Sequence, residues 1–462
     1  MVNTITDFDA IVIGGGIGGT AAGALLASKG YKILLVEKND IIGGRCSTYE
    51  KEGFKVDVGV HSFGRAHKGP LGEVLNRLGT EDQIEWIPCK NPGPRWYHQG
   101  KIIKFPHEFR QFVDDTEFRK LMRIIGKVMT IKDTSKLDDV SLKSWVSKYT
   151  SNTVIHSFFN VIGLFYFVIP YYEASAGEFI RCLATLTNDM STSYPVGGCV
   201  EIPSIYSQGI EKYGGRVIKG KKVKRIIIGN DEVNGIELEN GEIYTCKNVI
   251  SNSGIKETAK SLIGEEYFDK GYIDKISKLT YSLSALGFKI ALKKPITDLK
   301  VLISFSNDDP EEKYRSIIGG SVPKEVDFFV PIPSNYDFRV APDGKQLITA
   351  GTIVPRDSFE TNKQKWIKNS MESLEAIFPD INENIMWYDI TAPSDIENLG
   401  GKDAAVIGIS QSVSQSGVNR PSSILPIDGI YIVGGDAGGW GIGTEMAVKS
   451  AIDATNEIMK KI

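Results

Sequence analysis

Residues 9–37 read DAIVIGGGIGGTAAGALLASKGYKILLVE. An apolar run at 9–13 leads directly into glycines, an alanine-rich stretch follows at 20–29, and a second apolar run at 32–36 ends at Glu37. Apolar, β-branched runs are typical of buried strands in parallel sheets, and alanine favours helix. The stretch therefore predicts one β-α-β unit and an α/β fold class.

The glycines between the two predicted elements match the pattern G-x-G-x-x-G. Gly14 permits a tight turn, Gly16 lets backbone N–H groups approach a pyrophosphate, and Gly19 lets helix and strand pack closely. Glu37 lies 37 − 14 = 23 positions after the first glycine, where an acid receives ribose hydroxyls. An acid there disfavours a 2′-phosphate, so the motif predicts FAD or NAD rather than NADP.

Composition excludes several classes of protein. The chain has 462 residues, of which 41% are hydrophobic and 24% charged, as in an ordinary folded enzyme rather than a disordered or coiled-coil chain. There are 54 basic and 57 acidic residues, so the formal net charge is 54 − 57 = −3. Such a chain has no overall electrostatic attraction to nucleic acid, and we expect no nucleic-acid partner.

The five cysteines lie far apart and form no C-x-x-C pair, and the five histidines show no metal-ligand spacing. This spacing predicts neither a disulfide framework nor a metal site. The first nine residues lack the basic region of a signal peptide. We therefore expect a cytoplasmic protein without metal.

The apolar segment Val154–Tyr172 is about as long as a membrane span. It contains His156, Ser157 and Asn160, and Pro170 interrupts its end, so a bilayer suits it poorly. Two interpretations are favoured over a true span. One is a buried helix, and the other is the wall of an apolar substrate cavity or a face in peripheral contact with a membrane.

The middle of the chain differs from its two ends. Helical periodicity marks Phe112–Met129, Leu137–Tyr149 and Ala176–Leu186, so residues 86–195 are predicted to be mostly helical. The C-terminal end repeats the opening order of a strand, a glycine cluster and a helix at Gly443–Lys460.

Short alternating strands occupy Val217–Ile250, with Asn-Gly pairs at 234–235 and 240–241. Asn-Gly between alternating apolar residues favours a hairpin turn, so this region predicts an antiparallel meander.

Motifs after Glu37 point to one known family. Gly43-Gly44-Arg45 follows the acid, Tyr194-Pro195-Val196-Gly197-Gly198 precedes the meander, and Gly434-Gly435-Asp436 with Gly441-Ile442-Gly443-Thr444 lies near the end. This order resembles the FAD-dependent amine-oxidase and phytoene-desaturase superfamily, and most closely its phytoene-desaturase-like branch. The resemblance implies FAD contacts at Gly14, Gly16, Gly18, Gly19, Glu37, Lys38, Gly43, Gly44, Arg45, Gly59, Val60, His61, Val223, Gly435, Asp436, Gly443 and Thr444.

Within that family, Arg45 would lie beside the pyrophosphate and flavin, Val223 would offer backbone groups to adenine, and Asp436 would bind the ribityl chain. The final helix would direct its N-terminus at the flavin and stabilise negative charge there. No cysteine follows Cys246, so the C-terminal motif offers no residue for a cysteinyl-flavin link. The expected cofactor is therefore non-covalent FAD.

The resemblance also implies an interleaved domain organisation. We expect a Rossmann-type FAD-binding domain, a parallel sheet with an antiparallel meander, from residues 1–85, 196–280 and 420–462. An α+β substrate-binding domain is expected from residues 86–195 and 281–419.

Two residues are candidates for catalysis. The strand Leu286–Leu292 resembles the family's strand whose lysine holds a water near flavin N5, which makes Lys289 a candidate. A solvent-facing lysine is the alternative. His61 would lie near the flavin ring and could donate a proton, the alternative being a hydrogen-bonded structural histidine.

The predicted function is hydride transfer between a largely apolar small molecule and flavin N5. Desaturation, saturation and flavin-mediated isomerisation remain open, as do the oligomeric state and the electron acceptor, which could be oxygen, a quinone or another redox protein. One alternative is an amine oxidase that produces peroxide. Another is a non-enzymatic lipid- or prenyl-binding relative such as the Rab GDP-dissociation inhibitors, although a protein without FAD has no need of Glu37, Arg45 and Asp436.

Overall fold

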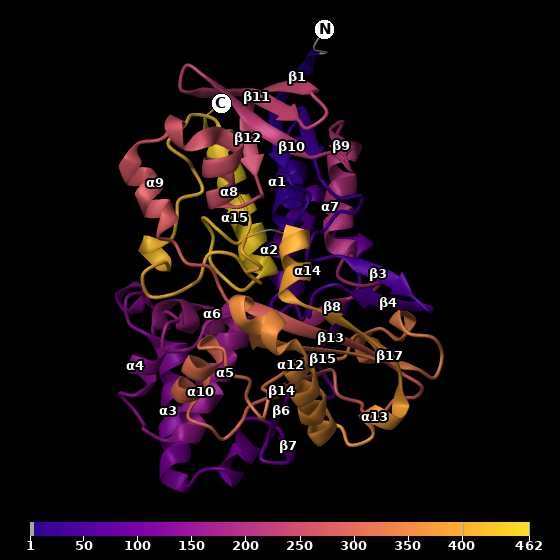
Figure 1. Ribbon diagram of the computed structural model, residues 1–462, viewed down its shortest axis with the longest axis vertical. Coiled ribbons are helices and arrows are strands. Elements are labelled where there is room, and N and C mark those ends of the chain that lie inside the picture. The colour runs from indigo at the N-terminus through magenta and orange to yellow at the C-terminus, as the bar shows by residue number, and fades with distance from the viewer. Residues whose placement is uncertain (1–3, 401, 462) are drawn as a thin grey trace.

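Two large sheets form the framework of the computed structural model, which describes residues 4–400 and 402–461. Figure 1 shows the first sheet in the upper half with both termini, and the second sheet in the lower half beside a group of helices. The mixed α/β fold predicted from the sequence is confirmed.

The first sheet has strand order β10-β11-β12-β1-β2-β9, and β18 pairs with β12. Pairing is parallel from β18 through β12, β1 and β2 to β9, and antiparallel from β10 to β12. Its strands are β1 (Thr4–Ile13), β2 (Ile33–Val36), β9 (Arg216–Ile218), β10 (Val223–Gly229), β11 (Glu232–Leu238), β12 (Ile243–Ser251) and β18 (Ile430–Ile432).

Helix α1 (Ile17–Ala27) packs on this sheet between α7 (Glu201–Lys212) and α15 (Thr444–Lys460). Every residue of α1 is buried, because its alanines and glycines let neighbouring elements approach closely. The β-α-β unit that opens the chain therefore forms the centre of this half of the molecule.

The second sheet has order β17-β13-β16-β15-β14-β6-β7. Its pairs are antiparallel except for β14 beside β6, which is parallel. Its strands are β6 (Arg95–His98), β7 (Lys101–Ile103), β13 (Ser284–Leu292), β14 (Val301–Ser304), β15 (Phe329–Pro331), β16 (Gln346–Val354) and β17 (Ile385–Thr391).

A group of helices lies beside the second sheet: α3 (Asp115–Thr130), α4 (Leu142–Val146), α5 (Thr153–Phe167) and α6 (Ala176–Asp189). The side chains of Asp114, Asn152 and Ser175 cap α3, α5 and α6 by accepting hydrogen bonds from free N–H groups. Along residues 4–400 and 402–461, no helix is both long and apolar enough to cross a membrane.

The remaining elements connect and cover these layers. They are β3 (Thr48–Lys51), β4 (Phe54–Asp57), β5 (Trp86–Pro88), β8 (Ser193–Pro195), α2 (Pro70–Leu78), α8 (Ile255–Glu257), α9 (Lys270–Ser277), α10 (Pro310–Ile318), α11 (Pro333–Tyr336), α12 (Arg356–Ile377), α13 (Ile381–Asn384) and α14 (Pro393–Gly400).

All strands of the first sheet come from residues 1–85, 196–280 and 420–462, and all strands of the second from 86–195 and 281–419. The segments are those assigned to the two domains from the sequence. The chain thus passes four times between the two sheets. The domain boundaries themselves stay a prediction.

Two local expectations were wrong. Asn234-Gly235 lies inside β11 rather than in a turn, because the first hairpin turns at Asn230-Asp231, both with positive φ. Gly235 instead serves a close strand contact, since a Cβ there would lie 2.1 Å from the Tyr244 carbonyl oxygen. The helix expected over Leu137–Tyr149 is reduced to the five residues of α4.

Candidate active site

A cavity of about 880 Å³ lies between the two halves of the molecule. One end is formed by the glycine turns of the first sheet, and the other by α3, α5 and α6. The cavity brings together these predicted residues: Gly14, Gly16, Gly18, Glu37, Lys38, Gly43, Gly44, Arg45, Gly59, Val60, His61, Val223, Lys289, Gly435, Gly443 and Thr444. Among the predicted residues, only Gly19 and Asp436 do not line it.

The first glycine turn connects β1 to α1. Gly14 has a φ of +96°, which favours glycine, and a Cβ at Gly16 would lie 2.5 Å from Asn252 Nδ2. Gly19 lies beneath the turn, where its Cβ would approach the Gly14 carbonyl oxygen to 2.1 Å. In the described part of the chain no side chain caps α1 at Gly16, and Ile17 and Gly18 of its first turn line the cavity.

Glu37 lies at the end of β2 and is buried. Its Oε2 accepts a hydrogen bond from the Gly15 N–H at 2.6 Å, and its Oε1 accepts one from the Asn39 N–H at 2.8 Å. The two bonds hold the carboxylate at the cavity wall, with lone pairs left for hydroxyl donors.

The Gly43-Gly44-Arg45 turn lies against the first turn, since the Gly43 N–H donates to the Gly15 carbonyl at 2.8 Å. The Arg45 guanidinium donates to the carbonyls of Ala405 and Val406 at 2.8 and 2.5 Å. Burial lowers the pKa of Arg45, while the charge of Asp436 opposes that shift.

A second buried cation, Lys402, was not identified from the sequence. Its Nζ lies 3.3 Å from Asp436 Oδ1, and burial lowers its pKa. Asp436 also accepts hydrogen bonds from the N–H groups of Ile255 and Ile409, at 3.1 and 3.2 Å. Asp436 thus contacts Lys402 and two backbone N–H groups of the surrounding loops, and its contact with the ribityl chain stays a prediction.

The cavity lining at this end carries Lys38, Arg45, Lys221, Lys222 and Lys402 against the carboxylates of Glu37 and Glu257, so positive charge exceeds negative charge there. Arg45 is half-buried and the Lys402 side chain is 4% exposed, and Asp436 is the carboxylate that interacts with them among the described residues. Uncapped N–H groups and unbalanced cations suit an anionic pyrophosphate, so the residues present fit a dinucleotide cofactor.

Lys289 lies on β13 and is only 2% exposed. Its Nζ donates to Thr391 Oγ1, and it lies beside Gly287 at the cavity wall. Burial lowers the pKa of Lys289 to about 8, against the raising effect of Asp395 and Asp389. The solvent-facing alternative for this lysine is therefore wrong.

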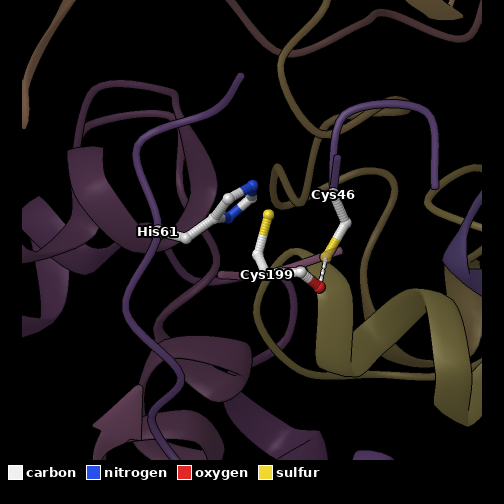
Figure 2. Close-up of side chains that lie close together, drawn as sticks. All are labelled: Cys46, His61 and Cys199. Atoms are coloured by element: carbon white, nitrogen blue, oxygen red, sulfur yellow. Dashed lines mark hydrogen bonds between the residues drawn. The ribbon is translucent and has the colours of Figure 1, made fainter. Parts of the chain in front are cut away.

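His61 lies at the cavity wall beside two cysteines that the sequence does not bring together. Figure 2 shows Cys46, His61 and Cys199, which come from three separate segments. The Nε2 atom of His61 lies 3.0 Å from the Arg45 carbonyl oxygen. Burial acts to lower the pKa of His61, but the Cys199 side chain, Asp57 and the Arg45 carbonyl outweigh it and raise this pKa to about 9.

The far end of the cavity is apolar. Its wall consists of aromatic and aliphatic side chains from α3, α5, α6 and nearby strands, namely Trp96, Phe105, Ile125, Val128, Met129, Phe158, Ile162, Phe165, Leu183 and Leu186. Most of the segment Val154–Tyr172 forms α5, which ends at Phe167, and this helix is both buried and part of the cavity wall.

One acidic group lies in this part of the cavity wall. Glu445, in the first turn of α15, is 5% exposed and accepts a hydrogen bond from the Arg65 N–H at 2.7 Å. Burial raises the pKa of Glu445 to about 7.

The family model for flavin-containing amine oxidoreductases matches residues 17–459. The chain belongs to this family. Prolycopene isomerase of Daucus carota is 26% identical over 93% of this chain and 76% of its own length. All-trans-retinol 13,14-reductase of Rattus norvegicus is 24% identical over 98% of this chain and 86% of its own.

Solved structures share the fold of this amine oxidoreductase family member. An oxidoreductase from Methanosarcina mazei has a TM-score of 0.79 at 21% identity, covering 98% of this chain and 100% of its own. Putrescine oxidase bound to putrescine has a TM-score of 0.71 at 14% identity, covering 98% and 99%. The protein is therefore an enzyme, a flavin-dependent oxidoreductase of the phytoene-desaturase-like branch, as the sequence predicts.

Sequence reasoning missed several polar residues of this flavoenzyme's cavity, among them Thr391, Lys402 and Glu445. Thr391 and Lys402 lie in segments without a motif, so only tertiary structure brings them to the cavity. Glu445 directly follows the Gly441–Thr444 motif, and an acid in the first turn of the final helix was a signal that could have identified it.

Proposed function

We propose that this protein binds FAD non-covalently and transfers hydride between a C–C bond of a largely apolar small molecule and flavin N5. The observation that carries the proposal is the continuity of one cavity from the glycine turns to the aromatic wall of α5. An apolar substrate that enters the far end would reach a cofactor held at the other.

The residues that would hold FAD are those that line the first end. The turns at Gly14–Gly19 and Gly43–Arg45 would face the pyrophosphate, Glu37 the ribose, and β10 at Val223 the adenine. When bound, FAD would supply a hydride acceptor or donor at N5.

The chain's own chemistry would lie in proton transfer and exclusion of water. Adding or removing hydride at one carbon of a C=C bond requires a proton to move at its neighbour. Glu445 suits this role, because a carboxyl whose pKa is about 7 can both donate and accept a proton near neutral pH. The apolar wall would keep bulk water from competing as a proton source.

A specific observation also favours the amine-oxidase alternative. Lys289 is buried at the cavity wall beside Thr391, where it could hold a water at the flavin. In support of the C–C chemistry, two relatives are named for a carotenoid isomerisation and a retinol reduction. The substrates in the names of these relatives are long apolar polyenes, and an aromatic cavity suits such molecules.

Flavin absorbance under anaerobic conditions tests the two alternatives directly. The oxidised protein is mixed with a panel of amines, polyenes and partly saturated polyenes, and the photoreduced protein is mixed with polyenes and enones. We expect spectral changes with polyenes or enones and none with amines. Bleaching by amines alone, with peroxide formed in air, would replace this proposal with the amine-oxidase function.

We further propose that the protein acts in the cytoplasm and reaches its substrate by peripheral contact with a membrane through α3. Residues 119–132 carry five basic and no acidic side chains. On α3, Met122 and Met129 are exposed, and Met129 also lines the cavity. Exposed apolar side chains among basic ones suit an anionic lipid surface.

Vesicle sedimentation measures this contact. We expect the yellow protein to sediment with vesicles that contain phosphatidylserine and to stay in solution with purely zwitterionic ones. Replacing Arg123 and Lys127 with glutamate should abolish sedimentation, whereas the same change at Lys460 and Lys461, exposed on α15 and just beyond it, should not. Equal sedimentation of both double variants would contradict the role of α3.

A further inference from the structure

Three potential metal ligands converge behind the Gly43-Gly44-Arg45 turn. The Cys46 thiol, the Cys199 thiol and one ring nitrogen of His61 all lie within 4.8 Å of one another (Figure 2). We propose that Cys46, His61 and Cys199 form a zinc-binding site. This departs from the expectation of no metal, which rested on spacing along the sequence, where the three residues are 61 − 46 = 15 and 199 − 61 = 138 positions apart.

The imidazole is already oriented as a ligand. A carbonyl oxygen only accepts hydrogen bonds, so His61 Nε2, 3.0 Å from the Arg45 carbonyl, carries the ring proton. Nδ1 offers its lone pair to zinc once it has released the proton that the raised pKa of His61 keeps on it near neutral pH. Histidine ligands of zinc characteristically donate their other ring N–H to such a group. Stacking on Phe63, at 5.7 Å between ring centroids and 21° between planes, fixes the ring further.

Both thiols are buried and chemically free. Cys46 is 2% exposed and donates to the Cys199 carbonyl at 3.3 Å, and Cys199 is fully buried and donates to the Ser47 carbonyl at 3.4 Å. In a tetrahedral zinc site, with Zn–S of about 2.3 Å and Zn–N of about 2.0 Å, ligand atoms lie about 3.5–4 Å apart. The three atoms would need to close by about 1 Å, which thiol rotation can supply.

Charge balance makes the buried position tolerable for the ion. Zinc would replace the two thiol protons and the Nδ1 proton of His61, which all pass to solvent, and the two thiolates and one neutral imidazole then cancel its charge of +2. A net neutral group has a small desolvation cost compared with an isolated ion. A set of two thiolates and one imidazole also binds zinc in preference to magnesium or calcium.

The site keeps one coordination position for a ligand from the cavity. Three protein ligands leave the fourth tetrahedral position to a water or substrate atom. Cys46 and His61 both line the cavity, so this position opens toward it. The inference does not rest on the proposed hydride transfer, because metal content is measured without turnover.

The test uses full-length yellow protein, reduced and then dialysed against zinc chloride. We expect one zinc per chain after gel filtration, and loss of that zinc in Cys46→Ser and Cys199→Ser. Cys246→Ser is the matched control, because Cys246 is also buried but lies outside the cluster. It should retain one zinc, and the flavin content of each variant reports that it is folded.

Cobalt(II) gives a readout that needs no variant. Bound to thiolates in a tetrahedral site, it absorbs in the red, beyond the flavin bands, and we expect such bands in the wild-type protein. Folded wild-type protein with five titratable thiols that retains no zinc would overturn the proposal. Zinc retained equally by the Cys46→Ser/Cys199→Ser double variant would also overturn it, as would a Cys46–Cys199 disulfide that persists under the reducing conditions.

Discussion

Lys289 is a buried cation, and its charge is expected to matter for oxygen chemistry. A cation near reduced flavin stabilises the negative charge that develops on oxygen during reoxidation. We expect Lys289→Met to slow reoxidation about tenfold for each 1.4 kcal/mol of stabilisation lost. Stopped-flow mixing of photoreduced protein with oxygen measures this without a known substrate.

The depressed pKa of Lys289 adds a pH signature. With a pKa of about 8, the side chain is charged below that pH and neutral above it. Reoxidation of the wild-type protein should therefore slow as pH rises through about 8, and Lys289→Met should lose this dependence. Lys293→Met, an exposed lysine just beyond β13, is the control. Identical rates in Lys289→Met and wild type at every pH would remove the amine-oxidase alternative's main support.

Glu445 should make stability depend on pH in the opposite sense from most carboxylates. Its pKa rises from 4.5 when unfolded to about 7 when folded, so between these values the folded state binds more protons. The contribution of Glu445 to the free energy of unfolding then falls by about 3 kcal/mol as pH rises from 4.5 to 7. Above pH 7 it stays level.

Urea unfolding of wild-type protein and Glu445→Gln at pH 5 and pH 8 measures the effect. The free energy of unfolding of the variant minus that of the wild type should be about 2–3 kcal/mol larger at pH 8 than at pH 5. Glu457→Gln, on the same helix but 43% exposed, should show no such gain. A pH-independent difference for Glu445→Gln would mean that its pKa is not raised.

At the scale of elements, two helical glycines should respond oppositely to alanine. A Cβ at Gly19 would lie 2.1 Å from a backbone oxygen, so Gly19→Ala should separate α1 from β1, cost about 1–3 kcal/mol and lower flavin content. Gly126 is exposed in α3 with no described heavy atom within 4 Å of such a Cβ, and Gly126→Ala should stabilise by up to about 1 kcal/mol. The melting temperature and the flavin-to-protein absorbance ratio measure these effects in both variants. A Gly19→Ala variant with the melting temperature and flavin content of the wild type would contradict the tight-packing role.

The elements also show what could be predicted from sequence. The β1-α1-β2 unit was predictable because strand, turn and helix signals are local and agree with one another. Asn234-Gly235 has the same local signal as a hairpin turn, yet the strand pairing of Gly235 with Thr245 decided its conformation. Lys402 could not be found, because its partner Asp436 is 34 positions away and no pattern connects them.

At the scale of the whole molecule, cofactor binding should depend on non-covalent contacts from both halves. Lys38 and Arg45 donate to the carbonyls of Asn398 and Ala405, so the α14 region closes over the nucleotide turn. Acid or heat should release yellow FAD into the supernatant, identified by its chromatographic retention. Colour that stays with the precipitate would indicate a covalent link.

The strand order of the first sheet also has a consequence for synthesis of the chain. Its last strand, β18, and the helix that packs on α1, α15, are translated some 400 residues after β1 and α1. The sheet therefore cannot be completed until β18 and α15 have been translated. The nascent chain must keep the apolar surface of α1 from aggregation until α15 emerges.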